Sequence, residues 1–106
     1  MKLKNMDINT IINNMSNNDL DSIILGVKSD IPVLNLNAVI FGTRFNVKDV
    51  DFITALTDDL ISSKETFFGN DLSSFVRASL DLLGIQPYNG DDDFTKRLIK
   101  SNMNFI

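Results

Sequence analysis

The sequence of 106 residues predicts an all-α protein with about six short helices. Two observations support this class: apolar residues recur at helical spacing in several segments, and residues typical of helix starts and ends separate these segments. The clearest segment is 72–83, whose apolar face consists of Leu72, Phe75, Val76, Leu80 and Leu83. Asn70 or Asp71 can cap its start, and Gly84 can end it in the left-handed conformation. We expect the helices to pack in antiparallel pairs within a single domain, residues 1–106.

Two short helices are expected before residue 30. Asp7 caps the first, whose apolar face consists of Ile8, Ile11, Ile12 and Met15. Asparagine and serine residues after Met15 favour caps and turns, so this helix should end there. Asn18 or Asp19 starts the second helix, whose apolar face consists of Leu20, Ile23, Ile24 and Val27. It should close before Pro32, because the residue preceding a proline disfavours helical backbone.

Segment 32–45 allows two interpretations. Pro32 suits the first position of a helix, whose apolar residues would be Val33, Leu36, Val39, Ile40 and Phe41. Leu34, Leu36, Ala38 and Ile40 also alternate as in a strand, with Asn35 and Asn37 between them. Helix is favoured for 33–41 because the segments on both sides are helical, and strand is the alternative.

A fourth helix is expected from about Val50 to Ser62. The sequence Asn46–Asp49 resembles a capping box at its start. Its predicted inner face consists of Val50, Ile53, Leu56, Leu60 and Ile61. A loop over 63–70 should connect it to the helix over 72–83.

The last helix follows a turn-rich break at 86–90. One of Asp91, Asp92 and Asp93 should cap this helix. Its inward residues would be Phe94, Leu98 and Ile99, and its outward residues Lys96, Arg97 and Lys100. Residues 102–106 form a tail that packs back or frays.

Composition argues against several function classes. The chain has no cysteine and no histidine, which removes disulfides, thiolate chemistry, the usual general base and the commonest metal ligand. We therefore predict no catalytic, cofactor-binding or metal-ligating residue, and no enzymatic activity. The basic start is not followed by a long apolar run, and no run of about 18 apolar residues occurs. The expected location is cytoplasmic, without membrane insertion.

Two motifs are set aside on physical grounds. Segment 89–93 has three aspartates that could suggest calcium binding, but an EF-hand needs a final bidentate glutamate, and the only glutamate is Glu65. Segment 38–56 has the length of a helix-turn-helix, but its second helix would bring mostly aspartates toward phosphates. Helix capping explains the first segment better, and nucleic acid is not an expected partner.

Charge is distributed unevenly along the chain. Residues 49–93 have a net charge of −8, and the remaining residues have +4. An acidic region disfavours phosphate backbones and favours a basic protein partner, although it can also be a solvated face that keeps the protein soluble. Phe67 and Phe68 are expected to anchor a partner, or else to cover the end of the core.

An internal similarity connects two parts of the chain. Val33-Leu34, Asn37-Ala38 and Phe41-Gly42 parallel Val76-Arg77, Ser79-Leu80 and Leu83-Gly84, with 42 residues between the two glycines. A period near 40 with two helices per unit resembles HEAT-like α-repeats over residues 19–101. Only the second block has the arginine usual in that pattern, and an unrelated small helical bundle is the alternative.

The resemblance to HEAT-like repeats implies a short right-handed stack of helix pairs, an α-α superhelix that binds proteins on its concave face. It implies no catalysis. The second helix of each unit would line this face, which places Asp51, Thr54 and Asp58 on one surface with Lys96 and Lys100. We predict these residues, together with Asp59, Phe67 and Phe68, as partner-binding.

The function expected from the sequence is a small non-enzymatic protein-interaction module. It would be an immunity or antitoxin-type protein from bacteria that neutralises a toxin by direct binding. The alternative is a regulator from a phage or mobile element that occupies a nucleic-acid-binding protein through its acidic surface. Frequent asparagine, isoleucine and lysine indicate an AT-rich bacterial or phage genome for either function.

Overall fold

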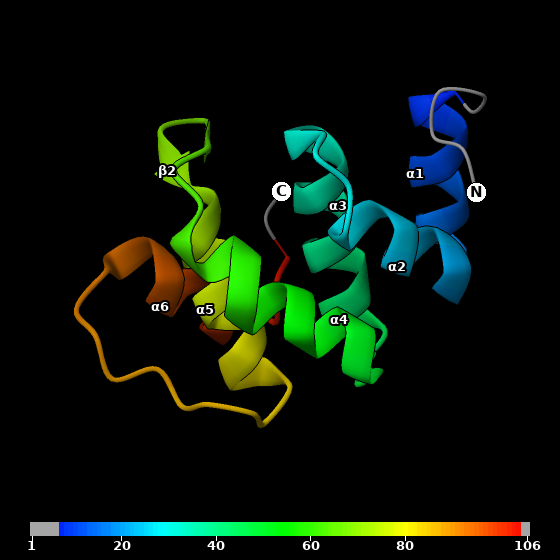
Figure 1. Cartoon of the computed structure of the whole chain (residues 1–106). Helices are drawn as coiled ribbons and strands as arrows, with labels where there is room; N and C mark the ends of the chain where they lie inside the picture. Colours follow the sequence, from blue (N-terminus) through cyan, green and yellow to red (C-terminus); the bar gives the residue numbers. More distant parts are fainter. Residues whose placement is uncertain (1–6, 105–106) are drawn as a thin grey trace.

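The computed structural model describes residues 7–104, which form six α-helices and one two-stranded hairpin (Figure 1). The predicted all-α class is confirmed. Segment 33–41 is helical, so the strand alternative is wrong. In chain order the elements are α1 (Ile8–Ser16), α2 (Leu20–Val27), α3 (Pro32–Arg44), α4 (Val50–Thr54), a π-helical turn η2 (Ala55–Asp59), a 3-10 turn η3 (Leu60–Ser62), β1 (Thr66–Phe67), β2 (Asn70–Asp71), α5 (Leu72–Leu82) and α6 (Asp93–Lys100).

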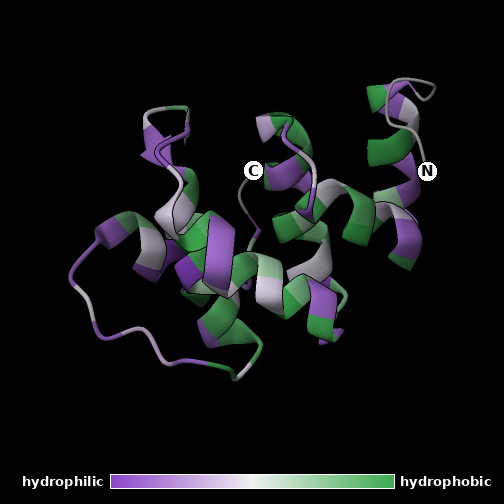
Figure 2. Cartoon of the chain, in the orientation of Figure 1, coloured by the Kyte–Doolittle hydropathy of each residue, from purple (hydrophilic) through white to green (hydrophobic). Residues whose placement is uncertain are grey.

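Helix α3 lies between two groups of elements (Figure 1). It packs against α1 and α2 on one side and against α5 on the other, and α5 in turn packs against α6 and η3. The buried apolar residues form one cluster that all these helices share. Figure 2 shows hydrophobic residues concentrated where the helices meet and mostly hydrophilic ones along the segment between α5 and α6.

Four helices end in the same way. The residues that follow the caps of α1, α3, α5 and α6 are Asn18, Asn46, Gly84 and Asn102, with positive φ values of 61°, 58°, 75° and 57°. At α5, the N–H of Ile85 donates to the Leu80 carbonyl at 2.9 Å, and the N–H of Gly84 donates to the Asp81 carbonyl at 3.0 Å. This Schellman geometry satisfies carbonyls that have no partner within the helix.

The helix end at Asn46 corrects one prediction. Asn46 terminates α3, and the N–H of Val47 donates to the Gly42 carbonyl at 2.8 Å. The cap of α4 is instead Asp49, whose carboxylate accepts the N–H of Asp51 at 2.8 Å. The predicted capping box over 46–49 is therefore wrong, because Asn46 is already used by the preceding helix.

The predicted apolar faces are wrong mainly at helix starts. Val50 is 74% exposed and Leu20 is 44% exposed, although both were expected inside. Ile8 and Val33 are exposed as well, and all four lie in the first turn of their helices. Each of the four is the first or second residue of its helix and is exposed, whereas Leu34 and Phe52, in the first turns of α3 and α4, are fully buried. In the fourth helix Leu56 and Leu60 are buried as predicted, and the residue that periodicity missed is Phe52, which is fully buried.

Two glycines, which have no side chain, allow neighbouring helices to approach closely. A Cβ at Gly42 of α3 would clash with the Phe52 ring of α4. A Cβ at Gly26 of α2 would clash with the Met15 side chain and lie 3.2 Å from the Leu34 carbonyl oxygen of α3. Both glycines thus serve helix packing at the cost of helix propensity.

Buried polar groups in the centre are paired. The Asn35 amide donates to the Gly26 and Ser29 carbonyls, each at 2.9 Å, and so closes the end of α2. The Thr43 hydroxyl donates to the Val39 carbonyl, which leaves Ser79 of α5 to donate to Thr43 at 2.5 Å. Within residues 7–104, no buried side-chain nitrogen or oxygen lacks a partner.

Asp92 caps α6, and it is one of the three aspartates predicted as candidates for this cap. Its carboxylate accepts the Thr95 hydroxyl at 2.6 Å, the Thr95 N–H at 3.0 Å and the Ser74 hydroxyl of α5 at 3.2 Å. The hydrogen bond from the Thr95 hydroxyl contributes most to lowering the pKa of Asp92 below its usual value, and the bond from the Thr95 N–H contributes next. The tail returns to the core through Met103, which is fully buried, whereas residues 105–106 lie outside the described part, as do residues 1–6.

Gly42→Ala is expected to destabilise the protein, although alanine favours helix by about 1 kcal/mol. The added methyl group overlaps the buried Phe52 ring, and overpacking of this kind costs about 1–3 kcal/mol. Urea unfolding should show a lower midpoint for Gly42→Ala. Adding Phe52→Leu should reduce the cost of the alanine, because the smaller side chain leaves room for it. Equal midpoints for Gly42→Ala and the wild type would contradict the packing described here.

The cap at Asp92 predicts a pH-dependent stability. Because the folded-state pKa is lowered, the ionised carboxylate stabilises the fold above the unfolded-state pKa of about 3.9, and this contribution is lost as pH falls through the folded-state pKa. Asp92→Asn should therefore be less stable than the wild type at neutral pH, and the difference should shrink as pH falls through the folded-state pKa of Asp92. Urea unfolding at several pH values measures this difference. Asp91→Asn is the control, and the same pH dependence in that variant would attribute the effect to overall charge.

Candidate functional site

A groove of about 720 Å³ lies between α2 and the start of α4. Four aspartates and one lysine provide its charged groups, so the groove is strongly acidic. Apolar side chains of α2 line it as well. Its lining residues include Asp19, Leu20, Asp21, Ile24, Asp49 and Asp51.

The aspartates come from two copies of one short pattern. Asp19-Leu20-Asp21 and Asp49-Val50-Asp51 each place an aspartate at the helix cap, an aliphatic residue at the first helical position and a second aspartate after it. The two capping carboxylates are held, since Asp19 accepts the Ser22 hydroxyl at 2.7 Å and Asp49 accepts the N–H of Asp51. The contact between α2 and α4 brings the two helix starts together.

The groove combines charge with apolar surface. Ile24 and Leu25 are half-buried against the core, and Leu20 is largely exposed at the groove. Lys28 is the one basic residue among the described lining residues. An apolar surface surrounded by carboxylates suits a segment that carries both aliphatic side chains and lysine or arginine.

The structure separates the predicted partner-binding residues. Asp51 lies in the groove. Thr54, Asp58 and Asp59 are exposed on the continuation of the same helix but do not line the groove.

The predicted lysines lie elsewhere. Lys96 and Lys100 lie on α6, beside a second hollow that Asp93 and Arg97 also line. Helix α6 lies apart from α4 in Figure 1, and the two lysines line a different hollow from Asp51.

Phe67 and Phe68 have different environments. Phe67 is half-buried against the core, as expected if it covers the end of a helix bundle. Phe68 lies at the tip of the hairpin and is 81% exposed. Phe68 and Gly69 both have positive φ, 55° and 81°, as in a two-residue type I′ turn. Of the two predicted anchors, Phe68 is the one that a partner can reach.

Sequence reasoning missed Asp19 and Asp21 as site residues. It assigned Asp19 only to capping, and both residues lie outside the acidic region 49–93. A usable signal was the repeated Asp-aliphatic-Asp pattern at two helix starts. An aliphatic residue at the first position of a helix is often exposed, and two flanking aspartates then make its surroundings acidic.

Other site classes receive no support from geometry. Within residues 7–104, no three acidic side chains come close enough together to hold a metal ion. No helix in this part of the chain combines the length and the apolar character that crossing a membrane requires.

Comparison with known proteins finds no matching family model, no matching curated protein and no matching solved structure. The resemblance to HEAT-like repeats therefore stays a prediction.

Phe68 provides a test of backbone strain at the hairpin tip. A residue with a Cβ at positive φ costs about 1–2 kcal/mol that glycine avoids. Phe68→Gly should therefore be more stable than Phe68→Ala by about 1 kcal/mol. Both variants lose the aromatic ring, so their difference isolates the backbone. Urea unfolding measures it, and equal stabilities would contradict the left-handed conformation at position 68.

Proposed function

We propose that this protein is a non-enzymatic binding module that neutralises a basic protein by direct contact, in the manner of an immunity protein or antitoxin. The observation that supports this proposal is the groove between α2 and α4. It is large enough for several side chains of a partner, and four exposed aspartates surround its apolar lining. The absence of histidine and cysteine from the sequence agrees with a role in binding.

The proposed contact has two parts. Aliphatic side chains of the partner pack against Leu20, Ile24 and Leu25, and the burial of this apolar surface supplies most of the affinity. Lysine or arginine residues of the partner face the aspartates, which accelerate association and exclude acidic competitors. Phe68 at the hairpin tip is a second proposed anchor, on another part of the surface.

The apolar lining also bears on the alternative function. A regulator that imitates the phosphate backbone needs carboxylates spaced along a polar surface. In the groove the carboxylates instead surround exposed and half-buried aliphatic side chains. This arrangement favours a partner that recognises a protein surface over one whose site normally holds nucleic acid.

The test uses two charge-reversal variants with the same change in net charge. Asp21→Lys with Asp51→Lys alters the groove, and Asp58→Lys with Asp59→Lys alters exposed positions outside it. The capping residues Asp19 and Asp49 stay unchanged, so both proteins should fold. The partner is the protein encoded beside this one, obtained by co-purification and by rescue of growth when both are expressed.

The groove variant should bind at least tenfold more weakly, about 1.4 kcal/mol, and associate more slowly at low salt, where exposed charges are least screened. It should also fail to rescue growth, whereas the variant at Asp58 and Asp59 should behave as the wild type does. Equal weakening by both variants would assign the effect to overall charge. A partner that is bound equally well by all three proteins would remove the groove from the proposed function.

A further inference from the structure

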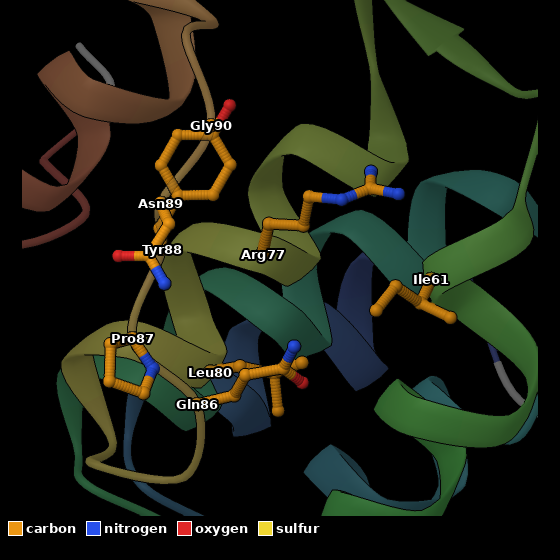
Figure 3. A pocket seen from close by; sticks show the side chains of 8 residues that line it. All are labelled: Ile61, Arg77, Leu80, Gln86, Pro87, Tyr88, Asn89 and Gly90. Carbon is orange, nitrogen blue, oxygen red and sulfur yellow. The ribbon is translucent and has the colours of Figure 1, made fainter.

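A third hollow, of about 290 Å³, lies on another part of the molecule, between η3, α5 and the segment that follows α5 (Figure 3). Ile61 of η3 lies on one side, and residues 86–90 lie on the other. Leu80 of α5 is buried beneath it, and Arg77 extends from the same helix along the rim. None of the charged residues of the acidic groove lines this hollow.

Hydrogen bonds hold the far wall in place. The N–H of Tyr88 donates to the Asp81 carboxylate at 2.8 Å, and the Tyr88 hydroxyl accepts the N–H of Asp92 at 2.9 Å. The N–H of Gln86 donates to the Leu80 carbonyl at 3.1 Å. A Cβ at Gly90 would clash with the Tyr88 ring, so the chain passes close over that ring. The wall is thus tied to both α5 and the start of α6.

The chemistry of the hollow differs from that of its surroundings. Arg77 is its one charged lining residue, and among the described residues no acidic side chain lines it, although residues 49–93 are strongly acidic overall. Gln86 and Asn89 add two side-chain amides, and Ile61, Leu80 and the Tyr88 ring add apolar surface. A guanidinium pairs with a carboxylate through two parallel hydrogen bonds, and it does so most strongly beside apolar surface that excludes water.

We propose that this hollow binds a small carboxylic acid with a compact apolar body. The carboxylate pairs with Arg77, and the apolar body packs between Ile61 and Tyr88 above Leu80. A volume of about 290 Å³ holds about ten non-hydrogen atoms, since a water molecule occupies about 30 Å³. A ring or short branched chain bearing one carboxylate fits that size, whereas a nucleotide does not.

Tyr88 provides a direct readout, because the chain contains one tyrosine and no tryptophan. The probe is cyclohexanecarboxylate, which has about nine non-hydrogen atoms and no absorption that overlaps tyrosine. Titration should change the tyrosine fluorescence saturably, with a dissociation constant of about 1–10 mM for a ligand of this size. Amide shifts in an NMR titration should concentrate at Arg77 and residues 86–90. Cyclohexylmethanol, which has the same ring without the charge, should bind at least tenfold more weakly.

Matched variants assign the effect to the guanidinium. Arg77→Gln should weaken binding of cyclohexanecarboxylate at least tenfold, and Arg44→Gln, which removes an exposed arginine at the end of α3, should leave it unchanged. The groove variant Asp21→Lys with Asp51→Lys should also bind the probe normally, so this result is independent of the proposed function. The proposal is overturned if no saturable change occurs up to about 20 mM. It is also overturned if the shifts map elsewhere, or if Arg77→Gln binds as well as the wild type.

Discussion

Helix α3 is buried on more than one face, and this burial constrains how the other helices pack around it. Its buried residues are Leu34, Asn35, Leu36, Ala38, Val39, Gly42 and Thr43, which do not lie on a single stripe. Helices α1 and α2 cover one part of it, and α5 covers another. A helix surrounded in this way can include polar residues only where they are paired, and Asn35 and Thr43 meet this condition through α2 and α5.

The same burial explains what the sequence could and could not predict. A helix that is apolar on several sides loses the contrast between faces, so segment 33–41 also fits the alternation of a strand. In α5 the large apolar residues share one face and a glycine follows the cap, so the sequence predicts its bounds and its large core residues, although Ser73, Ala78 and Ser79 are buried as well. Periodicity places Val50 inside and omits Phe52, because it does not show which side of a short helix start faces the core. The acidic groove depends on the proximity of α2 and α4, which are separated by 22 residues in sequence, and no local pattern encodes that proximity.

The four aspartates of the groove have different structural roles at different positions. The Asp49 carboxylate caps α4 by accepting a backbone N–H, whereas the Asp19 carboxylate accepts the Ser22 hydroxyl. Asp21 and Asp51 lie in the first helical turn, where the helix dipole favours a negative charge. Local stability and a negative groove are thus obtained from the same residues.

The helix ends have a consequence at the level of the gene. Three of the four left-handed residues that stop helices are asparagines, at positions 18, 46 and 102, and only one is a glycine. Asparagine codons begin with two adenines, and glycine codons begin with two guanines. Asparagine tolerates the left-handed conformation better than most residues with a Cβ, so it can take over the role of glycine at a modest energetic cost. A drift in nucleotide composition toward adenine and thymine can thereby replace glycine with asparagine at helix ends while the helix boundaries stay in place.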